Sequence, residues 1–126
     1  MTNKSSILKN ILDNDPDLKS HGFSSKDKIN EQAFWYCIEW LREQKVAKTF
    51  SSNQTSYSLK HLVEAWLRSK PNKPYRYISN DDLIAAAVFL KIPVKINGTN
   101  TKVAIAEPKA RKEFREKFDL TASSEL

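Results

Sequence analysis

The sequence predicts an α+β fold that is mainly helical, with about five helices and a β-hairpin after the fourth. Apolar residues recur at helical spacing in several windows, and these windows end at prolines or at turns rich in Asp and Asn. Residues 92–106 alternate instead with a period of two around the dipeptide Asn97-Gly98, which is a strong hairpin signal.

The chain has the size and composition of one folded domain. Its 126 residues are 40% hydrophobic and 10% aromatic, which is enough to bury a core. We expect an N-terminal helical part over residues 1–54, a basic helix-helix-hairpin-helix part over 55–120 and a frayed tail over 121–126. No stretch has the apolar core of a signal peptide or a membrane span, so we expect a cytoplasmic protein without a membrane partner.

Two helices are expected in the N-terminal part. Apolar residues at helical spacing predict the first over residues 5–13, and Pro16 ends it because proline cannot continue a helix. Ser24 followed by Asp27 forms a capping box, which predicts a second helix over about 26–45.

The second predicted helix is rich in aromatic residues. Trp35, Tyr36 and Trp40 widen its apolar face beyond the stripe that a surface helix needs. Either the N-terminal helix covers them, or they are the anchors of a homodimer or of another protein partner. Cys37 lies on the core stripe, so an inert buried thiol is expected, and a single cysteine forms no internal disulfide.

The basic part begins after a polar segment in which residues 46–50 could form a short strand. A third helix is expected over residues 56–69, with leucines on its buried face. The opposite, solvated face is predicted to carry Tyr57, Lys60, His61, Glu64 and Arg68.

A fourth helix opens at a second capping box, formed by Ser79 and Asp82, and runs to about Lys91. It is apolar all round, so we expect it at the centre of the fold. The hairpin then follows, with a four-residue loop at 97–100. Its register pairs Val94 with Val103, Ile92 with Ile105, and Lys95 with Lys102.

Pro108 opens the last predicted helix, which packs by its phenylalanines. Its basic residues are Lys109, Arg111, Lys112, Arg115 and Lys117, and two glutamates lie among them. This helix either lies along DNA or simply faces water.

Basic charge is concentrated in the second part of the chain. The formal net charge is +6; residues 1–54 hold 8 basic and 7 acidic side chains, whereas residues 55–126 hold 13 basic and 8 acidic ones. Such asymmetry suits a polyanionic partner, either a nucleic acid or an acidic protein surface. A lysine-rich surface that only keeps the protein soluble is the alternative.

The segment from residue 57 to residue 76 is the main candidate for contact with nucleic acid. Its basic groups neutralise phosphates, while its tyrosine rings stack on unpaired bases. The candidate nucleic-acid-binding residues are Tyr57, Lys60, His61, Arg68, Lys70, Lys73, Tyr75, Arg76, Lys95 and Lys102. The alternative is a connecting loop whose tyrosines pack back on the core.

No catalytic motif stands out. His61 and Glu64 lie three apart on a predicted helix and could share a proton or hold a metal. However, Lys60 and Arg68 stand four residues either side of Glu64, so ion pairs on a solvated face also explain them. The two acids that open the fourth helix are explained by capping. We therefore expect no catalytic residue, metal or cofactor, and a small nuclease is the less favoured alternative.

The order of elements over residues 55–106 resembles that of winged helix-turn-helix proteins. The helix in the recognition position would be NDDLIAAAVFLK, which opens with two acids and has almost no polar face. A helix that reads a major groove needs polar or basic residues at its exposed positions, so standard docking of this kind is not expected.

Two stretches, SYSLKHLVE (56–64) and YISNDDLIAAAVFLKIPVK (77–95), resemble small uncharacterised proteins carried by bacterial plasmids and phages. Those proteins place a Ser-Tyr-x-Leu-Lys-His helix before a Tyr-x-Ser-Asn turn and an Ala-rich helix. The resemblance brings no assigned activity, so it implies no functional residue. It implies a bacterial mobile-element setting, in which small proteins are often DNA-binding regulators or inhibitors of host defence systems.

The sequence thus leads us to expect a small, basic, non-enzymatic protein that binds DNA or RNA through a surface of basic and aromatic residues. The alternative is a protein-binding module, such as an inhibitor of a host defence system.

Overall fold

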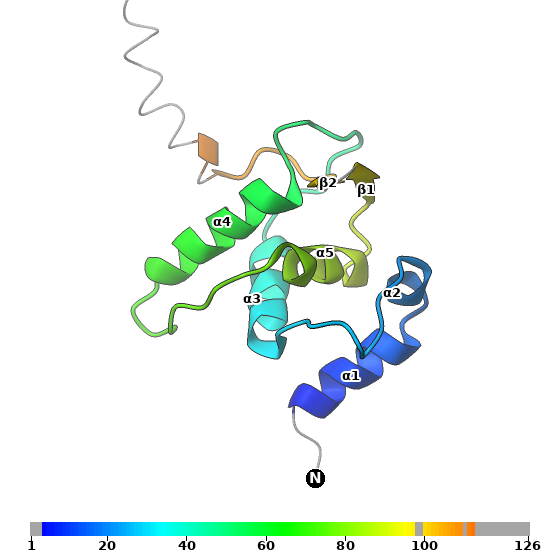
Figure 1. The fold of residues 1–126 in the computed structure, drawn as a ribbon. Coiled ribbons are helices and arrows are strands. Elements are labelled where there is room, and N and C mark those ends of the chain that lie inside the picture. The colour runs from blue at the N-terminus through cyan, green and yellow to red at the C-terminus, as the bar shows by residue number, and fades with distance from the viewer. Residues whose placement is uncertain (1–3, 98–99, 110, 113–126) are drawn as a thin grey trace, which may run out of the picture.

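The computed structural model describes residues 4–97, 100–109, 111 and 112 of the chain. The elements in this part are the helices α1 (Lys4–Asn14), α2 (Pro16–Ser20), α3 (Glu31–Leu41), α4 (Ser56–Arg68) and α5 (Asn80–Phe89), and the strands β1 (Val94–Asn97) and β2 (Asn100–Val103). The fold is α+β and mainly helical, as the sequence predicts, and the hairpin follows the apolar helix α5 (Figure 1). None of the described helices is both long and apolar enough to cross a membrane.

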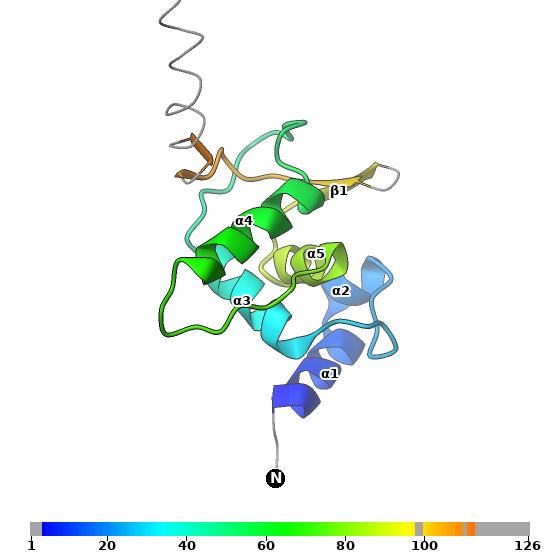
Figure 2. The same ribbon diagram turned by 60° about the vertical axis from the view of Figure 1, so that its left-hand side comes forward.

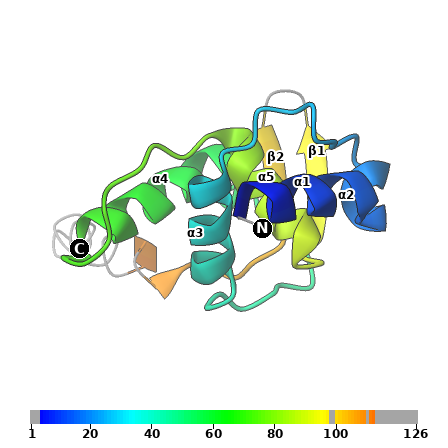
Figure 3. The same cartoon turned by 90° about the horizontal axis from the view of Figure 1, so that it is seen from below.

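Helix α5 is the centre of the fold. It packs against α2, α3, α4 and both strands, and the turned view shows it enclosed by these elements (Figure 2). Leu83, Ala85, Ala86 and Ala87 are fully buried, and the small alanines let the neighbouring helices come close. From below, α4 and the pair α1 and α2 lie at opposite ends of the molecule (Figure 3). Helix α5 is the fourth helix of the sequence prediction, and its predicted position at the centre of the fold is confirmed.

Asp82 joins the beginnings of α3 and α5. Its Oδ1 accepts a hydrogen bond from the backbone N–H of Asn30 at 2.9 Å, and its Oδ2 accepts one from the N–H of Ser79 at 3.0 Å. The Ser79 hydroxyl in turn accepts from the N–H of Asp82, which completes the predicted capping box. Burial raises the pKa of the Asp82 carboxyl, and these hydrogen bonds act in the opposite direction.

The N-terminal region contains a short helix that the prediction lacks. Pro16 does not simply end α1, because it is also the first residue of α2. The Asp15 carboxylate caps α2 by accepting from the N–H groups of Asp17 and Leu18, both at 3.0 Å. Proline is favourable at a first helical position, and fully buried Leu18 holds α2 on the core.

Helix α3 is shorter than the predicted helix over about 26–45. Ser24 and Asp27 do form a turn, in which the Ser24 N–H donates to Asp27 Oδ2 at 2.7 Å. The turn does not continue as a helix, because the residues after it are largely solvated, and Asn30 caps α3 instead through the N–H of Ala33. After Leu41 the chain forms a turn, in which the Gln44 N–H donates to the Leu41 carbonyl at 3.0 Å, and the Lys45 carbonyl then accepts from the N–H of Ala106.

The aromatic residues of α3 are covered within the chain. Trp40 is buried, Trp35 and Tyr36 are partly buried against the core, and the rings of Phe34 and Trp35 meet edge to face at 5.0 Å. Most of the aromatic surface of α3 is therefore covered within the chain, and a homodimer or another protein partner stays a prediction. Cys37 is fully buried, and burial raises the pKa of its thiol.

The hairpin has the predicted register at its base. The pairs are Val94 with Val103, Lys95 with Lys102, Ile96 with Thr101 and Asn97 with Asn100. The predicted pair of Ile92 and Ile105 does not form. The Ile92 N–H donates to the Ala87 carbonyl at 2.9 Å in the turn that ends α5, and Ile105 bridges to Val46.

Strand β2 has neighbours on both sides. The Val103 N–H donates to the Gln54 carbonyl at 2.9 Å, and Thr55 forms an isolated bridge with Lys102. Beyond the strand, the Ala47 N–H donates to the Ala104 carbonyl at 2.8 Å. Residues 54 and 55 thus hold β2, and residues 45–47 hold the chain just after it, instead of forming the continuous strand considered for residues 46–50.

Candidate nucleic-acid interface

Helix α4 presents two opposite flanks beside its buried face. Thr55 and Ser58 cap it reciprocally, and Leu59, Val63 and Leu67 are buried against the core. With 3.6 residues per turn, Tyr57, His61 and Arg68 fall on the flank away from Trp66. The candidate residues of α4 and of the segment after it are therefore divided between these two flanks.

The chain returns along α4 after the helix ends, and this return covers part of the face that the sequence predicts to be solvated (Figure 1). Lys60 is only 6% exposed and Glu64 only 4% exposed. The prediction that both residues face water is therefore wrong. A helical wheel of α4 shows only the stripe that packs on the core. The returning residues up to Ile78 bury a second strip of the helix next to that stripe, which the wheel does not show.

Glu64 is a structural carboxylate between α4 and the returning segment. Its Oε2 accepts a hydrogen bond from the N–H of fully buried Ile78 at 3.0 Å. Its Oε1 lies 3.0 Å from Nδ1 of His61, whose side chain is half exposed. The expected ion pairs with Lys60 and Arg68 are replaced by these two contacts, because the backbone N–H of Ile78 needs an acceptor inside the fold.

Two tyrosines flank the ammonium group of Lys60. Its Nζ lies 4.9 Å from the ring centroid of Tyr77 and 5.5 Å from that of Tyr57. These rings are nevertheless largely in the solvent, with Tyr57 54% and Tyr77 63% exposed. Such cation–π contacts hold both rings in place while leaving them accessible.

Arg68 holds a third exposed tyrosine at the far end of α4. Its guanidinium carbon lies 4.5 Å from the ring centroid of Tyr75, and its Nη2 donates to the Tyr75 hydroxyl at 3.1 Å. Tyr75 is 48% exposed. We call this flank of α4 and the returning chain the tyrosine face, which consists of Tyr57, Lys60, His61, Arg68, Tyr75 and Tyr77.

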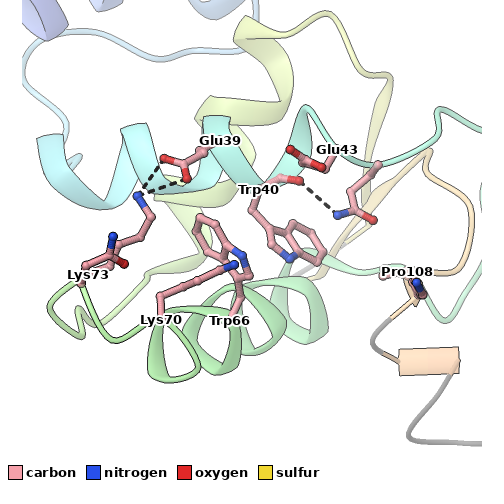
Figure 4. Close-up of a pocket in the computed structure, with 10 residues that line it drawn as sticks. Glu39, Trp40, Glu43, Trp66, Lys70, Lys73 and Pro108 are labelled. Atoms are coloured by element: carbon pink, nitrogen blue, oxygen red, sulfur yellow. Dashed lines mark hydrogen bonds and ion pairs between the residues drawn. The ribbon is translucent and has the colours of Figure 1, made fainter.

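The other flank of α4 borders a groove of about 690 Å³. Trp40 from α3 and Trp66 from α4 extend into the space between these helices (Figure 4). We call it the Trp66 groove, and its lining residues are Glu39, Trp40, Glu43, Gln44, Trp66, Lys70, Asn72, Lys73, Pro108 and Lys109. Acidic and basic groups both line it, so its charge is mixed.

Lys70 and Lys73 belong to the Trp66 groove and not to the tyrosine face. Their Nζ atoms lie 5.9 and 5.7 Å from the Trp66 ring centroid. Lys73 also forms an ion pair with Glu39 at 3.2 Å, which offsets its charge. The candidate basic set is thus split, and part of it is neutralised within the chain.

The remaining candidate residues surround the tyrosine face. Arg76 is exposed between Tyr75 and Tyr77 on the returning chain. Lys95 and Lys102 face each other on the hairpin, and the backbone of Lys102 bridges to Thr55, two residues before Tyr57. Positive charge therefore borders this face along the chain and at the beginning of α4.

Arg111 has a structural role at the start of the predicted C-terminal helix. Its Nη1 donates to the Asn53 carbonyl at 2.6 Å and to Gln54 Oε1, and its Nη2 donates to the Ser58 hydroxyl at 2.8 Å. Burial lowers the pKa of the guanidinium. Lys109, Arg111 and Lys112 are helical, whereas Arg115 and Lys117 lie outside the described residues.

Tyr77 is the member of the tyrosine face that the candidate list lacks. Its signal in the sequence is the alternation Tyr75-Arg76-Tyr77, which places both rings on one side of an extended chain. By contrast, the groove-reading role of a winged helix has no support in α5, since this helix is buried. Within the described residues, no three His, Cys, Asp or Glu side chains gather as a metal site requires.

Comparison of the chain with protein-family models, with curated proteins and with solved structures found no match. The functional argument therefore starts from the tyrosine face itself.

Proposed function

We propose that this protein binds nucleic acid through the tyrosine face. The observation that carries the proposal is a row of three exposed tyrosine rings, Tyr57, Tyr77 and Tyr75, each held by a cation at its face. Aromatic rings on a basic surface bind strands without sequence preference, because every base has a π-face to stack on.

Rigid positioning of the rings supports this proposal. A binding site gains affinity when its side chains are ordered before the ligand arrives. Lys60 is shared by Tyr57 and Tyr77, and Arg68 both covers and hydrogen-bonds Tyr75. Little side-chain entropy is then lost when bases stack on these rings.

Charge supplies the second part of the proposed interaction. Arg68 and Arg76 are exposed within or beside the tyrosine face, and the hairpin lysines lie next to the beginning of α4. Phosphate contacts of this kind release counterions, so the affinity falls steeply with salt.

Fluorescence anisotropy tests the proposal with labelled single-stranded DNA, RNA and duplex DNA at about 50 and 200 mM salt. We expect binding that weakens with salt, and Tyr57→Ala with Tyr77→Ala weakens it about tenfold or more, since each stacked base contributes ~1–3 kcal/mol. The charge variant Arg68→Ala with Arg76→Ala has a matched control in Lys9→Ala with Lys28→Ala, which removes two exposed charges elsewhere. Equal effects of these two variants would contradict the proposed site.

A protein partner is the second candidate, and the Trp66 groove favours it. Two tryptophans line this groove, and tryptophan is enriched in protein interfaces and among the residues that contribute most to binding. The test is binding of a purified protein partner. This second function is established if Trp66→Ala abolishes that binding and the double variant Tyr57→Ala with Tyr77→Ala leaves it unchanged.

A further inference from the structure

His61 of the tyrosine face pairs with the carboxylate of Glu64, one turn further along α4. His61 Nδ1 lies 3.0 Å from Glu64 Oε1, and the exposed fractions of the two side chains are 50% and 6%. The second oxygen of Glu64 is occupied by the N–H of Ile78, so the carboxylate is fixed from two directions. A buried, fixed carboxylate beside a half-exposed imidazole is the arrangement that orients a histidine for proton transfer.

The tautomer follows from this geometry. A carboxylate only accepts hydrogen bonds, so the neutral imidazole carries its proton on Nδ1 and donates it to Glu64. Nε2 is then the acceptor nitrogen that meets a ligand on the exposed side. The Tyr57 ring packs edge to face on the imidazole, with the centroids 4.7 Å apart, and limits its rotation.

The ring of Tyr57 connects His61 to a cation, because it contacts both the imidazole and the Lys60 ammonium group. Lys60 lies one residue before His61 in the sequence, and its ammonium group contacts the rings of Tyr57 and Tyr77. The cluster therefore combines a proton acceptor, a positive charge and surfaces for bases.

We propose that the tyrosine face cleaves single-stranded RNA by transesterification, with His61 as the general base. This inference rests on the proposed nucleic-acid binding. RNA brings its own nucleophile, the 2′-hydroxyl next to each phosphodiester. DNA lacks this hydroxyl and binds without being cleaved.

The proposed step balances within the substrate. Nε2 of His61 takes the proton of the 2′-hydroxyl, the 2′-oxygen forms a bond to phosphorus, and the bond from phosphorus to the 5′-oxygen breaks. The leaving 5′-oxygen takes a proton from solvent, and His61 returns its proton to solvent. The products are a 2′,3′-cyclic phosphate and a 5′-hydroxyl end, and no water or other reactant is consumed.

The other residues of the cluster have distinct roles. The Lys60 ammonium group is largely buried, so it holds the rings of Tyr57 and Tyr77 in place and does not contact the phosphate. Tyr57 and Tyr77 hold the bases on either side of the scissile phosphate by stacking. Glu64 is a positioning residue, because it touches His61 and not the substrate.

The experiment compares three strands of one sequence: RNA, DNA and 2′-O-methyl RNA. With EDTA present, we expect only the RNA to be cut, with 2′,3′-cyclic phosphate ends on the products, while all three strands bind. At saturating protein, His61→Ala slows cleavage by about 100-fold or more, since a general base contributes ~10²- to 10⁴-fold, while 2′-O-methyl RNA still binds. His21→Ala is the matched control, because His21 is exposed at the end of α2 and is not part of the tyrosine face, and it leaves the rate unchanged.

The positioning role of Glu64 has its own readout. Glu64→Gln keeps an oxygen for the N–H of Ile78 but cannot orient His61 as a carboxylate does. We expect a lower kcat with KM within about twofold, and an unchanged near-ultraviolet circular dichroism spectrum confirms the fold.

Three results would overturn the inference. Binding without cleavage would reject it and leave the proposed function standing. No binding of any strand would reject both. Cleavage that survives His61→Ala in identically prepared protein would remove His61 from the reaction.

Discussion

Helices α4 and α5 begin in the same way and lie in opposite surroundings. Each opens with a hydroxyl cap, Thr55 for α4 and Ser79 for α5, that bonds reciprocally with the third residue of the helix. Helix α5 is enclosed by α2, α3, α4 and the hairpin, whereas α4 turns one flank to the solvent. The same type of cap therefore fixes where each helix begins. Whether the helix is then buried or exposed depends on the elements that pack around it.

Packing gives the largest expected difference between the two helices. Ala86→Leu on α5 adds a bulky side chain at a fully buried position, so we expect a loss of about 3 kcal/mol in the free energy of unfolding. Ala65→Leu makes the same change at an exposed position of α4, and we expect it to change the free energy of unfolding by about 0.5 kcal/mol or less. Urea unfolding measures both, and similar losses would refute the contrast.

The buried carboxylate of α4 gives the next largest effect. Glu64→Ala leaves the buried N–H of Ile78 without its acceptor, so we expect a loss of about 2 kcal/mol in the free energy of unfolding. Glu43→Ala is the control, because Glu43 is exposed just beyond α3. If the two variants unfold at the same urea concentration, the returning segment is not held through Glu64.

The buried carboxylate of α5 gives the smallest effect, which depends on pH. Because the pKa of Asp82 is raised in the folded state, the native protein binds more protons than the unfolded chain just above pH ~4. Its contribution to stability therefore decreases as the pH rises through that window. The stability difference between wild type and Asp82→Asn, measured by urea unfolding at each pH, should shrink from about pH 4 to pH 7, and a constant difference would contradict the raised pKa.

Features encoded by neighbouring residues could be predicted from the sequence. The pairing of Val94 with Val103 follows from alternation around Asn97-Gly98, and the burial of α5 follows from its apolar composition on all sides. In these cases short-range pattern and tertiary structure agree.

Features that depend on distant segments could not be predicted. Lys60 and Glu64 are buried because residues up to Ile78 return over them, and no helical wheel contains that information. The division of the basic residues has the same origin, since Lys73 meets Glu39 on another helix. The start of α2 at Pro16 shows a local ambiguity, because proline both ends helices and begins them.

The cover on β2 also has a consequence for how this molecule meets other chains. An unpaired strand edge is a template for strand addition and aggregation. In the described part of the sheet, Gln54 and Thr55 occupy the outer side of β2, so β1 is the edge left open. That edge is only four residues long, follows Pro93 and carries exposed Lys95, all of which discourage pairing with a foreign strand.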